Sequence, residues 1–169
     1  MAGRTSSRRA GLLAPGLVTA VATVLTLSGC SLFDRDEERT DAVSVFDVEV
    51  GQCFRVPDDI TVELTELPAV ACTEPHEQEA YARLTFTEPG TGTTPKTFPG
   101  ADALKSFADA ACAAAFADYV GVDYRDSSLY FTYLAPSPRG WEQNADRTTL
   151  CFVTTTGEEL TASVKGTGW

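Results

Sequence analysis

Residues 101–120 read ADALKSFADAACAAAFADYV, and this stretch decides the fold. Its apolar side chains recur at the spacing of one helix face: Leu104, Phe107, Ala108, Ala111, Cys112, Ala115, Phe116 and Tyr119. Lys105, Asp109 and Asp118 fall on the opposite side. Gly121 follows directly, and glycine readily takes the left-handed conformation that ends a helix. The pattern predicts one amphipathic helix over 101–120.

Short segments of strand-like sequence flank this helix on both sides. We expect strands at 45–56, 61–71, 79–87 and 129–135, and a final hairpin of 148–155 and 160–164 around Gly157. The alternation is cleanest in 79–87, where every second residue from Ala80 to Phe86 is apolar and shares one side. Residues 88–100 and 136–146 are expected to be loops. The sequence therefore predicts an α+β fold, a mainly antiparallel sheet packed by one amphipathic helix.

The N-terminus has the layout of a bacterial lipoprotein signal. Three arginines within the first nine residues precede an uncharged run over 10–27, and the first thirty positions hold no acidic residue. The run ends in LSGC at 27–30, with small residues directly before a cysteine. A positive start, an apolar middle and a small-residue cleavage site are the parts of a secretory signal. We expect residues 1–29 to be removed and Cys30 to become the lipidated first residue, with palmitate among its acyl groups.

This segment leaves two alternatives open. The 18 residues of the uncharged run are just enough to cross a bilayer, so an uncleaved signal anchor competes with the processed lipoprotein. The start Ser7-Arg8-Arg9 also resembles a twin-arginine export signal, although the residues that follow are not those that such signals favour. By either export route, the expected location is the outer, extracytoplasmic face of the cell membrane, with the protein held by its lipid.

The rest of the chain divides into a tether and one domain. Residues 30–44 begin with the lipidated cysteine and carry a run of acidic side chains: Asp34, Asp36, Glu37, Glu38 and Asp41. Little in this run can be buried, so we expect a solvated tether. Residues 45–169 suit one domain with its own core. Without residues 1–29 the chain has 10 basic and 24 acidic side chains, and its net charge of −14 opposes binding to nucleic acid or to an anionic lipid surface.

The five cysteines indicate two disulfides in an exported protein. With Cys30 assigned to the lipid, Cys53, Cys72, Cys112 and Cys151 remain, and four cysteines allow three connectivities. Cys112 lies on the apolar helix face and Cys151 in a predicted strand, so a helix-to-sheet bridge Cys112–Cys151 fits the architecture and leaves Cys53–Cys72. A zinc site is the rival, but no two cysteines have the close spacing usual for zinc ligands. We expect no metal and no cofactor.

The only histidine lies in the densest polar motif, CTEPHEQE at 72–79. His76 could act as a ligand or a proton-transfer group among Glu74, Glu77 and Glu79, or it could hold a rigid turn by bonding to the backbone. One histidine cannot supply the several ligands of a catalytic zinc site. We favour the structural role and keep His76 as a candidate binding residue.

A second candidate surface is aromatic. Trp141, with Tyr124, Tyr130 and Tyr133, is expected either to line a groove for a glycan or peptide or, as we favour, to anchor the core and loops. No serine lies in a Gly-x-Ser-x-Gly elbow, and no cysteine is spare for nucleophilic chemistry once the pairs form. We therefore expect that the protein is not an enzyme. A hydrolase with His76 as its base is the less favoured alternative.

The chain resembles the septum-formation domain family of actinobacterial envelope proteins through several motifs that follow one another in the family's order. They are VGQCF at 50–54, CTEPHEQE at 72–79, the helix with Cys112 that ends at Tyr119-Val120-Gly121, Trp141, Asp146-Arg147, Cys151 and the stretch 163–166. The resemblance covers residues 48–166, nearly the whole domain. Gln52 stands where an acidic residue is usual in the family, and Ala145 and Ala162 stand where glycine is common.

The resemblance implies a location and a type of function. Domains of this family lie outside the membrane on lipoproteins or transmembrane proteins, the family name suggests a link to cell division, and no catalytic residue carries over. We expect a non-catalytic, membrane-tethered accessory module that binds another envelope protein, with His76, Trp141 and Arg147 as candidate binding residues. The alternative is a lipoprotein that binds a cell-wall glycan or small ligand through Trp141 and the neighbouring tyrosines.

Overall fold

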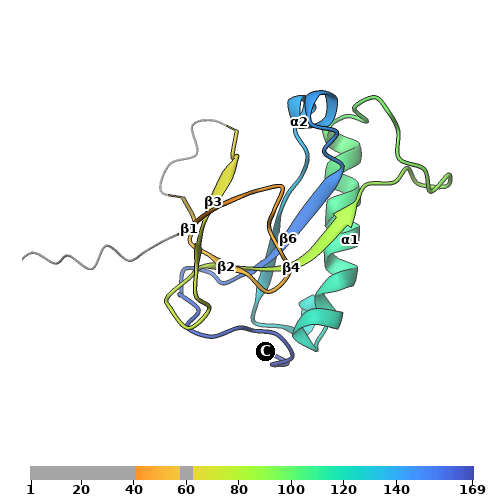
Figure 1. Ribbon diagram of the computed structural model, residues 1–169. Coiled ribbons are helices and arrows are strands. Elements are labelled where there is room, and N and C mark those ends of the chain that lie inside the picture. Colours follow the sequence, from red (N-terminus) through yellow and green to blue (C-terminus); the bar gives the residue numbers. More distant parts are fainter. Residues whose placement is uncertain (1–40, 58–62) are drawn as a thin grey trace, which may run out of the picture. The chain divides into compact units, whose positions relative to one another are not determined.

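A computed structural model describes residues 41–57 and 63–169 of the chain. In this part, an antiparallel sheet of six strands packs against one long helix (Figure 1). The elements are, in chain order, β1 (Asp41–Ser44), β2 (Cys53–Phe54), β3 (Glu66–Val70), β4 (Gln78–Thr85), α1 (Ala101–Val120), the 3₁₀ helix η1 (Tyr124–Asp126), β5 (Tyr130–Leu134), α2 (Pro138–Gln143) and β6 (Thr148–Thr154). The predicted α+β fold is confirmed.

The strand order across the sheet is β1-β3-β2-β4-β6-β5, and every neighbouring pair is antiparallel. The longest pairing joins β4 to β6, from Gln78 opposite Thr154 to Thr85 opposite Thr148. The helix α1 contacts β4, β5 and β6, and Figure 1 shows it running alongside these strands. The sheet therefore has one face covered by α1 and two edge strands, β1 and β5.

The long helix begins and ends where the sequence predicts. Its buried side chains lie on the predicted apolar face: Leu104, Ala108, Cys112, Phe116, Tyr119 and Val120. Gly121 has a φ of 96° and donates its N–H to the Ala117 carbonyl at 2.9 Å, as expected for a left-handed helix end. The C-terminal segment packs against this end, where the Gly166 N–H bonds to the Tyr119 carbonyl at 2.8 Å. The last residues of the chain are thereby fixed to α1.

A β-bulge in β4 places its side chains on faces that simple alternation does not predict. The pairing of β4 with β6 shifts between Ala80 and Ala82. Ala82 packs with Tyr81 and Cys112 in the core beneath α1, whereas Ala80 packs with Phe152 on the other face of the sheet. The prediction that Ala80 and Ala82 share one side is wrong, because the extra residue of a bulge reverses the alternation beyond it.

Both predicted disulfides are present. Cys53–Cys72 joins β2 to the turn that follows β3, and Cys112–Cys151 joins α1 to β6. The bonded residues are 19 and 39 positions apart in sequence, respectively. Because loops of this size restrict the unfolded chain, each bridge contributes about 3–4 kcal/mol to stability. One disulfide therefore stabilises the part of the sheet formed by β3 and β2, and the other fixes α1 to the part that contains β6.

Three predicted strand boundaries differ from the structure. The expected strand over 45–56 is reduced to β2, because turns occupy residues 45–47 and 50–51. The strand β1 begins at Asp41, inside the segment expected to be a tether. The expected final hairpin is absent: β6 ends at Thr154, and Leu160 forms only a single bridge, to His76. The chain after β6 thus crosses to the turn at His76 instead of folding back on β6.

A short helix replaces part of the loop expected over 136–146. The Ser137 hydroxyl oxygen accepts the Gly140 N–H at 2.8 Å and so caps α2. Pro138 occupies the first turn of α2, where its missing N–H removes no helix hydrogen bond. Trp141 lies in this helix and not in an irregular loop. The cap and the proline together explain why so short a segment is helical.

The predicted signal over 1–29 and Cys30 lie outside the described residues. Of the predicted tether over 30–44, the structure describes Asp41–Ser44, which form β1. Within the described ranges 41–57 and 63–169, no helix has both the length and the apolar character needed to cross a membrane.

Candidate functional site

His76 is fully buried and is bonded to the backbone around it. Its backbone N–H donates to the Leu160 carbonyl at 2.9 Å, and its carbonyl accepts from the Leu160 N–H at 2.7 Å. Its ring Nδ1 lies 2.8 Å from the Glu74 carbonyl, and because a carbonyl can only accept, Nδ1 donates this hydrogen bond. The Nε2 atom has no hydrogen-bond partner. His76 therefore holds the turn at 72–79, and its side chain does not reach the surface.

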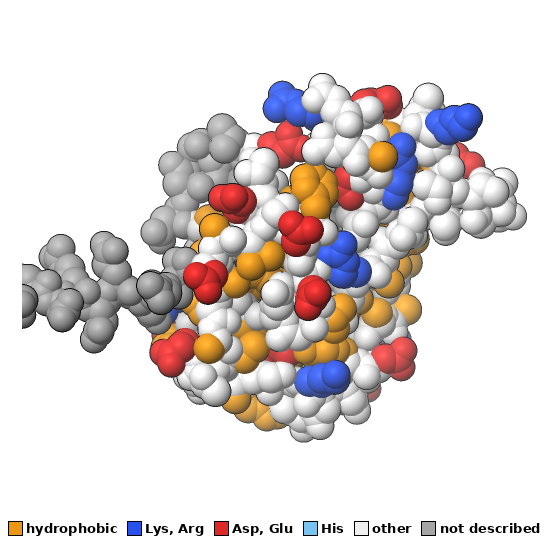
Figure 2. All heavy atoms as spheres, viewed as in Figure 1, with side chains coloured by type: hydrophobic (Ala, Val, Ile, Leu, Met, Phe, Trp, Pro, Cys, Tyr) orange, Lys and Arg blue, Asp and Glu red, His pale blue; other side chains and the backbone are white. Residues whose placement is uncertain are grey.

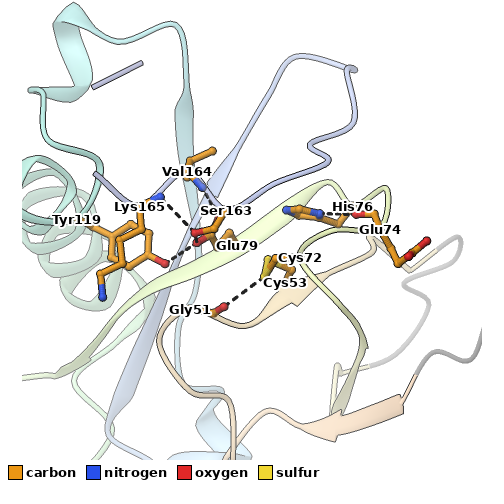
Figure 3. Close-up of a disulfide and its surroundings, with 10 residues drawn as sticks. All are labelled: Gly51, Cys53, Cys72, Glu74, His76, Glu79, Tyr119, Ser163, Val164 and Lys165. Carbon is orange, nitrogen blue, oxygen red and sulfur yellow. Dashed lines mark hydrogen bonds between the residues drawn. A yellow bond between two sulfur atoms is a disulfide. The ribbon is translucent and has the colours of Figure 1, made fainter. Parts of the chain in front are cut away.

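Glu79 of β4 is a buried carboxylate that receives three hydrogen bonds. Its Oε1 accepts from the Tyr119 hydroxyl at 2.5 Å and from the Ser163 hydroxyl at 2.6 Å, and its Oε2 accepts from the Val164 N–H at 2.8 Å. Figure 3 shows these groups meeting at the carboxylate from α1 and from the C-terminal segment. Since a buried charge needs such partners, Glu79 joins β4, α1 and the chain end.

Two buried tyrosines next to this network hold their protons more tightly than usual. Burial raises the pKa of Tyr119 well above its ordinary value of 10.0, and the hydrogen bond to Glu79 raises it further. Burial likewise raises the pKa of Tyr81, whose hydroxyl donates to the Cys112 carbonyl at 2.8 Å. Folding therefore favours the neutral form of both side chains. Their contribution to stability is complete below the pKa of an unfolded tyrosine and is lost as the pH rises above it.

We expect the free energy of unfolding to fall above about pH 10 by up to about 1.4 kcal/mol per pH unit for each of these tyrosines. Urea unfolding at pH values on both sides of the ordinary tyrosine pKa measures this slope. Tyr119→Phe should decline less steeply, because it removes one of the two groups. Tyr130→Phe is the matched control, since Tyr130 is exposed and should leave the profile unchanged. A profile that stays flat in alkali would contradict the prediction.

The buried Trp141 and the half-buried Arg147 pack against each other. The Trp141 side chain is 1 % exposed and packs edge-on against Phe86 and Phe98. The Arg147 guanidinium lies 3.8 Å from the indole ring centre and donates to the Trp141 carbonyl at 2.7 Å. The indole N–H donates to the Lys96 carbonyl at 3.0 Å. The indole therefore presents no open face to a ligand, and its role in this structure is to anchor α2.

The three tyrosines that the sequence analysis groups with Trp141 do not join it. Tyr124 packs edge-on against Phe131 after the end of α1. Tyr130 lies on the edge strand β5 with its side chain in solvent, and Tyr133 of the same strand lies near Asp109 of α1. The aromatic groove considered for a glycan is therefore not formed by these residues.

A different groove, of about 420 Å³, lies between the sheet, the segment before β3, and α2. Its apolar lining comprises Val45, Phe46, Leu64, Leu134, Ala135 and Leu150. Four of these side chains belong to or pack on the core cluster that faces away from α1. The groove is thus an opening in that second core, and its volume lies in the range of sites that bind small molecules or a few side chains.

Side chains of both charges border the groove. Arg83 donates to two backbone carbonyls, one of them that of Phe46 at 3.0 Å, and so fixes one wall. At another wall, Glu63 accepts from the Ser137 hydroxyl and lies 3.7 Å from Arg139 Nη1. Phe46 is 42 % exposed. Figure 2 shows acidic and basic side chains set among exposed hydrophobic atoms on one face of the domain. The groove therefore combines apolar surface with polar groups that are already held in place.

The serine in the groove lining is already hydrogen-bonded within the fold. Ser137 lies in the groove wall, but its hydroxyl is occupied as the cap of α2 and as a donor to Glu63. The chain's single histidine is buried outside the groove lining. Sequence reasoning missed the groove because its walls come from four separate segments. The one signal available was Arg83, a long cation that follows the apolar residues Ala80, Tyr81 and Ala82 of β4.

One set of possible metal ligands converges among the described residues. Ligand atoms of Cys53, His76 and Glu79 all lie within 4.8 Å of one another, and all three residues are buried. Cys53 is bonded to Cys72, so its sulfur is not a thiolate in this state. The cluster lies beside the network around Glu79 (Figure 3).

Comparison with known protein families gives a match over most of the chain. The family model described as septum formation matches residues 50–168. This range contains both disulfides, the whole of α1, the bonded turn at His76 and the C-terminal segment that bonds to Glu79. No curated protein and no solved structure matches the chain.

Proposed function

Because the chain belongs to the septum-formation family, we propose that it is a non-catalytic accessory module that binds another envelope protein during septum formation. In this proposal, lipid on Cys30 holds the protein at the outer face of the cell membrane. The tether over 30–44 lets the domain reach partners in the same membrane and raises its local concentration near them. The family match supports the link to septum formation, and the groove between the sheet and α2 supports binding.

The groove carries the proposal, because its lining suits a protein segment. Its apolar residues can bury one or two hydrophobic anchor side chains, and buried anchors of this kind supply most of the binding energy at protein interfaces. Arg83, Glu63 and Arg139 at the border offer polar groups for the partner's backbone or charged side chains. The net charge of −14 without residues 1–29 favours a partner surface that is basic or neutral. We therefore propose a partner segment with a hydrophobic anchor flanked by basic residues.

Two observations support the non-catalytic part of the proposal. His76, the only histidine, bonds to the backbone and is fully buried. Ser163 is exposed, but its hydroxyl is engaged in a hydrogen bond that it donates to the buried Glu79 carboxylate at 2.6 Å. A hydrolase that used His76 as its base would need both the histidine and a nucleophile to face a substrate. The alternative hydrolase function therefore lacks an accessible base.

A photo-crosslinking residue at position 135 tests the groove directly in living cells. Ala135 is exposed and lines the groove, so we expect crosslinks from this position to a protein. Ala114, exposed in the middle of α1, is the matched control and should give no such crosslink. Ala135→Arg should fill the groove and abolish the interaction, while the urea unfolding midpoint stays that of the wild type. Loss of binding with intact folding would assign the interaction to the groove.

Other outcomes would change the proposal. Identical crosslinked products from positions 135 and 114 would contradict the groove as the interface. No protein crosslink, combined with tight binding of purified peptidoglycan fragments that Ala135→Arg abolishes, would favour the glycan-binding alternative. A tagged copy distributed evenly around the membrane would argue against a role at the septum.

The lipid anchor has its own test. We expect a clickable fatty acid fed to cells to label the wild-type protein, because Cys30 follows the small residues of the predicted signal. The Cys30→Ala protein should carry no label. It should either leave the membrane fraction or keep the uncleaved signal segment over residues 1–29. Cys30→Ser gives a second variant of nearly the same size without the thiol. Label that persists on either variant would contradict lipidation at this position.

A further inference from the structure

One buried atom beside the Cys53–Cys72 disulfide has no hydrogen-bond partner: Nε2 of His76. The other ring nitrogen is occupied by the Glu74 carbonyl, so Nε2 is the nitrogen left for a ligand. In Figure 3 the ring points from Glu74 toward Glu79 and the disulfide. An unpartnered polar atom in a fully buried side chain is unusual, because buried polar groups are otherwise almost always hydrogen-bonded.

We propose that these residues form a redox-controlled zinc site. When a dithiol reductant opens the disulfide, Cys53 and Cys72 become thiols, and they bind one Zn²⁺ together with His76 and Glu79. Two thiolates, one imidazole and one carboxylate are ligand types that zinc takes in tetrahedral sites. While the disulfide is intact, two of the four ligands are missing and the site does not bind zinc. The proposal is independent of the binding function proposed for the groove.

The distances suit this assignment. Ligand atoms around a tetrahedral zinc ion lie about 3.3–3.8 Å apart, given zinc–ligand distances of about 2.0–2.3 Å. The ligand atoms of Cys53, His76 and Glu79 already lie within 4.8 Å of one another, so only small shifts are needed. The Cys72 sulfur is bonded to that of Cys53 and therefore lies next to the other three ligand atoms. All four ligands are gathered before any zinc binds.

Glu79 has room for a metal ion. A carboxylate offers about four acceptor positions, and the donors from Tyr119, Ser163 and Val164 occupy three of them. Oε1 accepts two of these bonds, whereas Oε2 accepts one. The free position is therefore on Oε2. The three donors would also orient the carboxylate, as hydrogen bonds to ligands do in known metal sites.

The exposure of the two sulfurs sets the order of the reduction. Cys72 is partly exposed, whereas Cys53 is 1 % exposed, so a thiolate of the reductant attacks the Cys72 sulfur. The bond between Cys53 and Cys72 breaks, and Cys53 leaves as a thiolate that takes up a proton. The second thiol of the reductant then displaces Cys72, so the dithiol is oxidised to a disulfide and two thiols remain. Zinc binding to both sulfurs releases their two protons.

Cobalt(II) is the probe for this site, because it replaces zinc and its tetrahedral thiolate complexes absorb visible light. We expect the full chain, reduced with a phosphine, to bind one equivalent of cobalt with a thiolate-to-metal charge-transfer band. The oxidised chain should show no band. Zinc added in one equivalent should displace the cobalt. Near-ultraviolet circular dichroism checks that the reduced chain stays folded.

Matched variants separate this site from the other disulfide. The double variant Cys112→Ala/Cys151→Ala should keep the cobalt band after reduction. The double variant Cys53→Ala/Cys72→Ala should lose the band. Any band that remains in this second variant would report cobalt binding by Cys30 or by the other cysteine pair. His76→Gln keeps both sulfurs, and its cobalt affinity should fall by at least about tenfold. The proposal is overturned if the reduced wild type shows no charge-transfer band or unfolds. It is also overturned if His76→Gln binds cobalt as tightly as the wild type does.

Discussion

Glu79→Ala should lower the free energy of unfolding by about 3–6 kcal/mol, since it leaves two buried donors without their acceptor at about 1–3 kcal/mol each and removes a third hydrogen bond from the exposed Ser163. The donors are the hydroxyls of Tyr119 and Ser163 and the N–H of Val164. They belong to α1 and to the C-terminal segment, so the loss also weakens the attachment of both to β4. Urea unfolding followed by circular dichroism and by tryptophan fluorescence measures the change. A loss of this size would be a large fraction of the total stability of a small domain, which is only about 5–15 kcal/mol.

Two further substitutions show whether the carboxylate itself is responsible. Glu79→Gln keeps the size of the side chain and one acceptor oxygen, so its cost should be smaller, about 2–3 kcal/mol. Glu74→Ala removes an exposed carboxylate a few residues away and should change stability by less than about 0.5 kcal/mol, because His76 bonds to the backbone of Glu74 and not to its side chain. Equal losses for Glu79→Ala and Glu74→Ala would contradict the network.

The features that the sequence predicted are those with a strong local signal. The helix over 101–120 has a continuous apolar face and a glycine at its end, and the structure places both as expected. The disulfide Cys112–Cys151 followed from the inward position of Cys112 on that face. Once that pair was chosen, Cys53–Cys72 was the remainder. A regular period and a pairing rule were enough in these cases.

The features that the sequence missed depend on contacts between distant segments. The carboxylate of Glu79 has partners 40 and more positions away, in α1 and in the C-terminal segment. The groove combines side chains from strands, from the turn after β1 and from α2. The bulge at Ala80 and Ala82 has no local signal, because it arises from the pairing with β6. No pattern along the chain reports such partners.

One departure from the family pattern has a structural explanation. Ala145 stands where glycine is common in the family, and its φ is 52°, the only positive φ of a non-glycine residue in the described ranges. Glycine takes this left-handed conformation more readily than alanine does. The turn after α2 is therefore formed here despite an unfavourable residue. The family resemblance marks position 145 as one where glycine is usual, and the positive φ of Ala145 explains that preference.

Trp141→Ala should destabilise the domain by about 4–5 kcal/mol, the upper part of the range for removing a buried aromatic side chain. The indole is 1 % exposed, packs against Phe86 and Phe98, and lies under the Arg147 guanidinium. Removing it leaves a cavity between α2 and α1 and deprives Arg147 of its packing surface. Urea unfolding followed by far-ultraviolet circular dichroism measures the loss, since the substitution removes one of the two tryptophan fluorophores.

Trp169→Ala is the matched control, because the same atoms are removed from a side chain that is 56 % exposed. Its cost should stay below about 0.5 kcal/mol, since the hydrogen bond from Ser127 goes to the backbone carbonyl of Trp169. The pair also separates the two roles considered for Trp141. A large loss of stability with binding retained in the folded fraction fits an anchor of α2. Unchanged stability with lost binding to the partner would instead make Trp141 a contact residue, which its burial in this structure argues against.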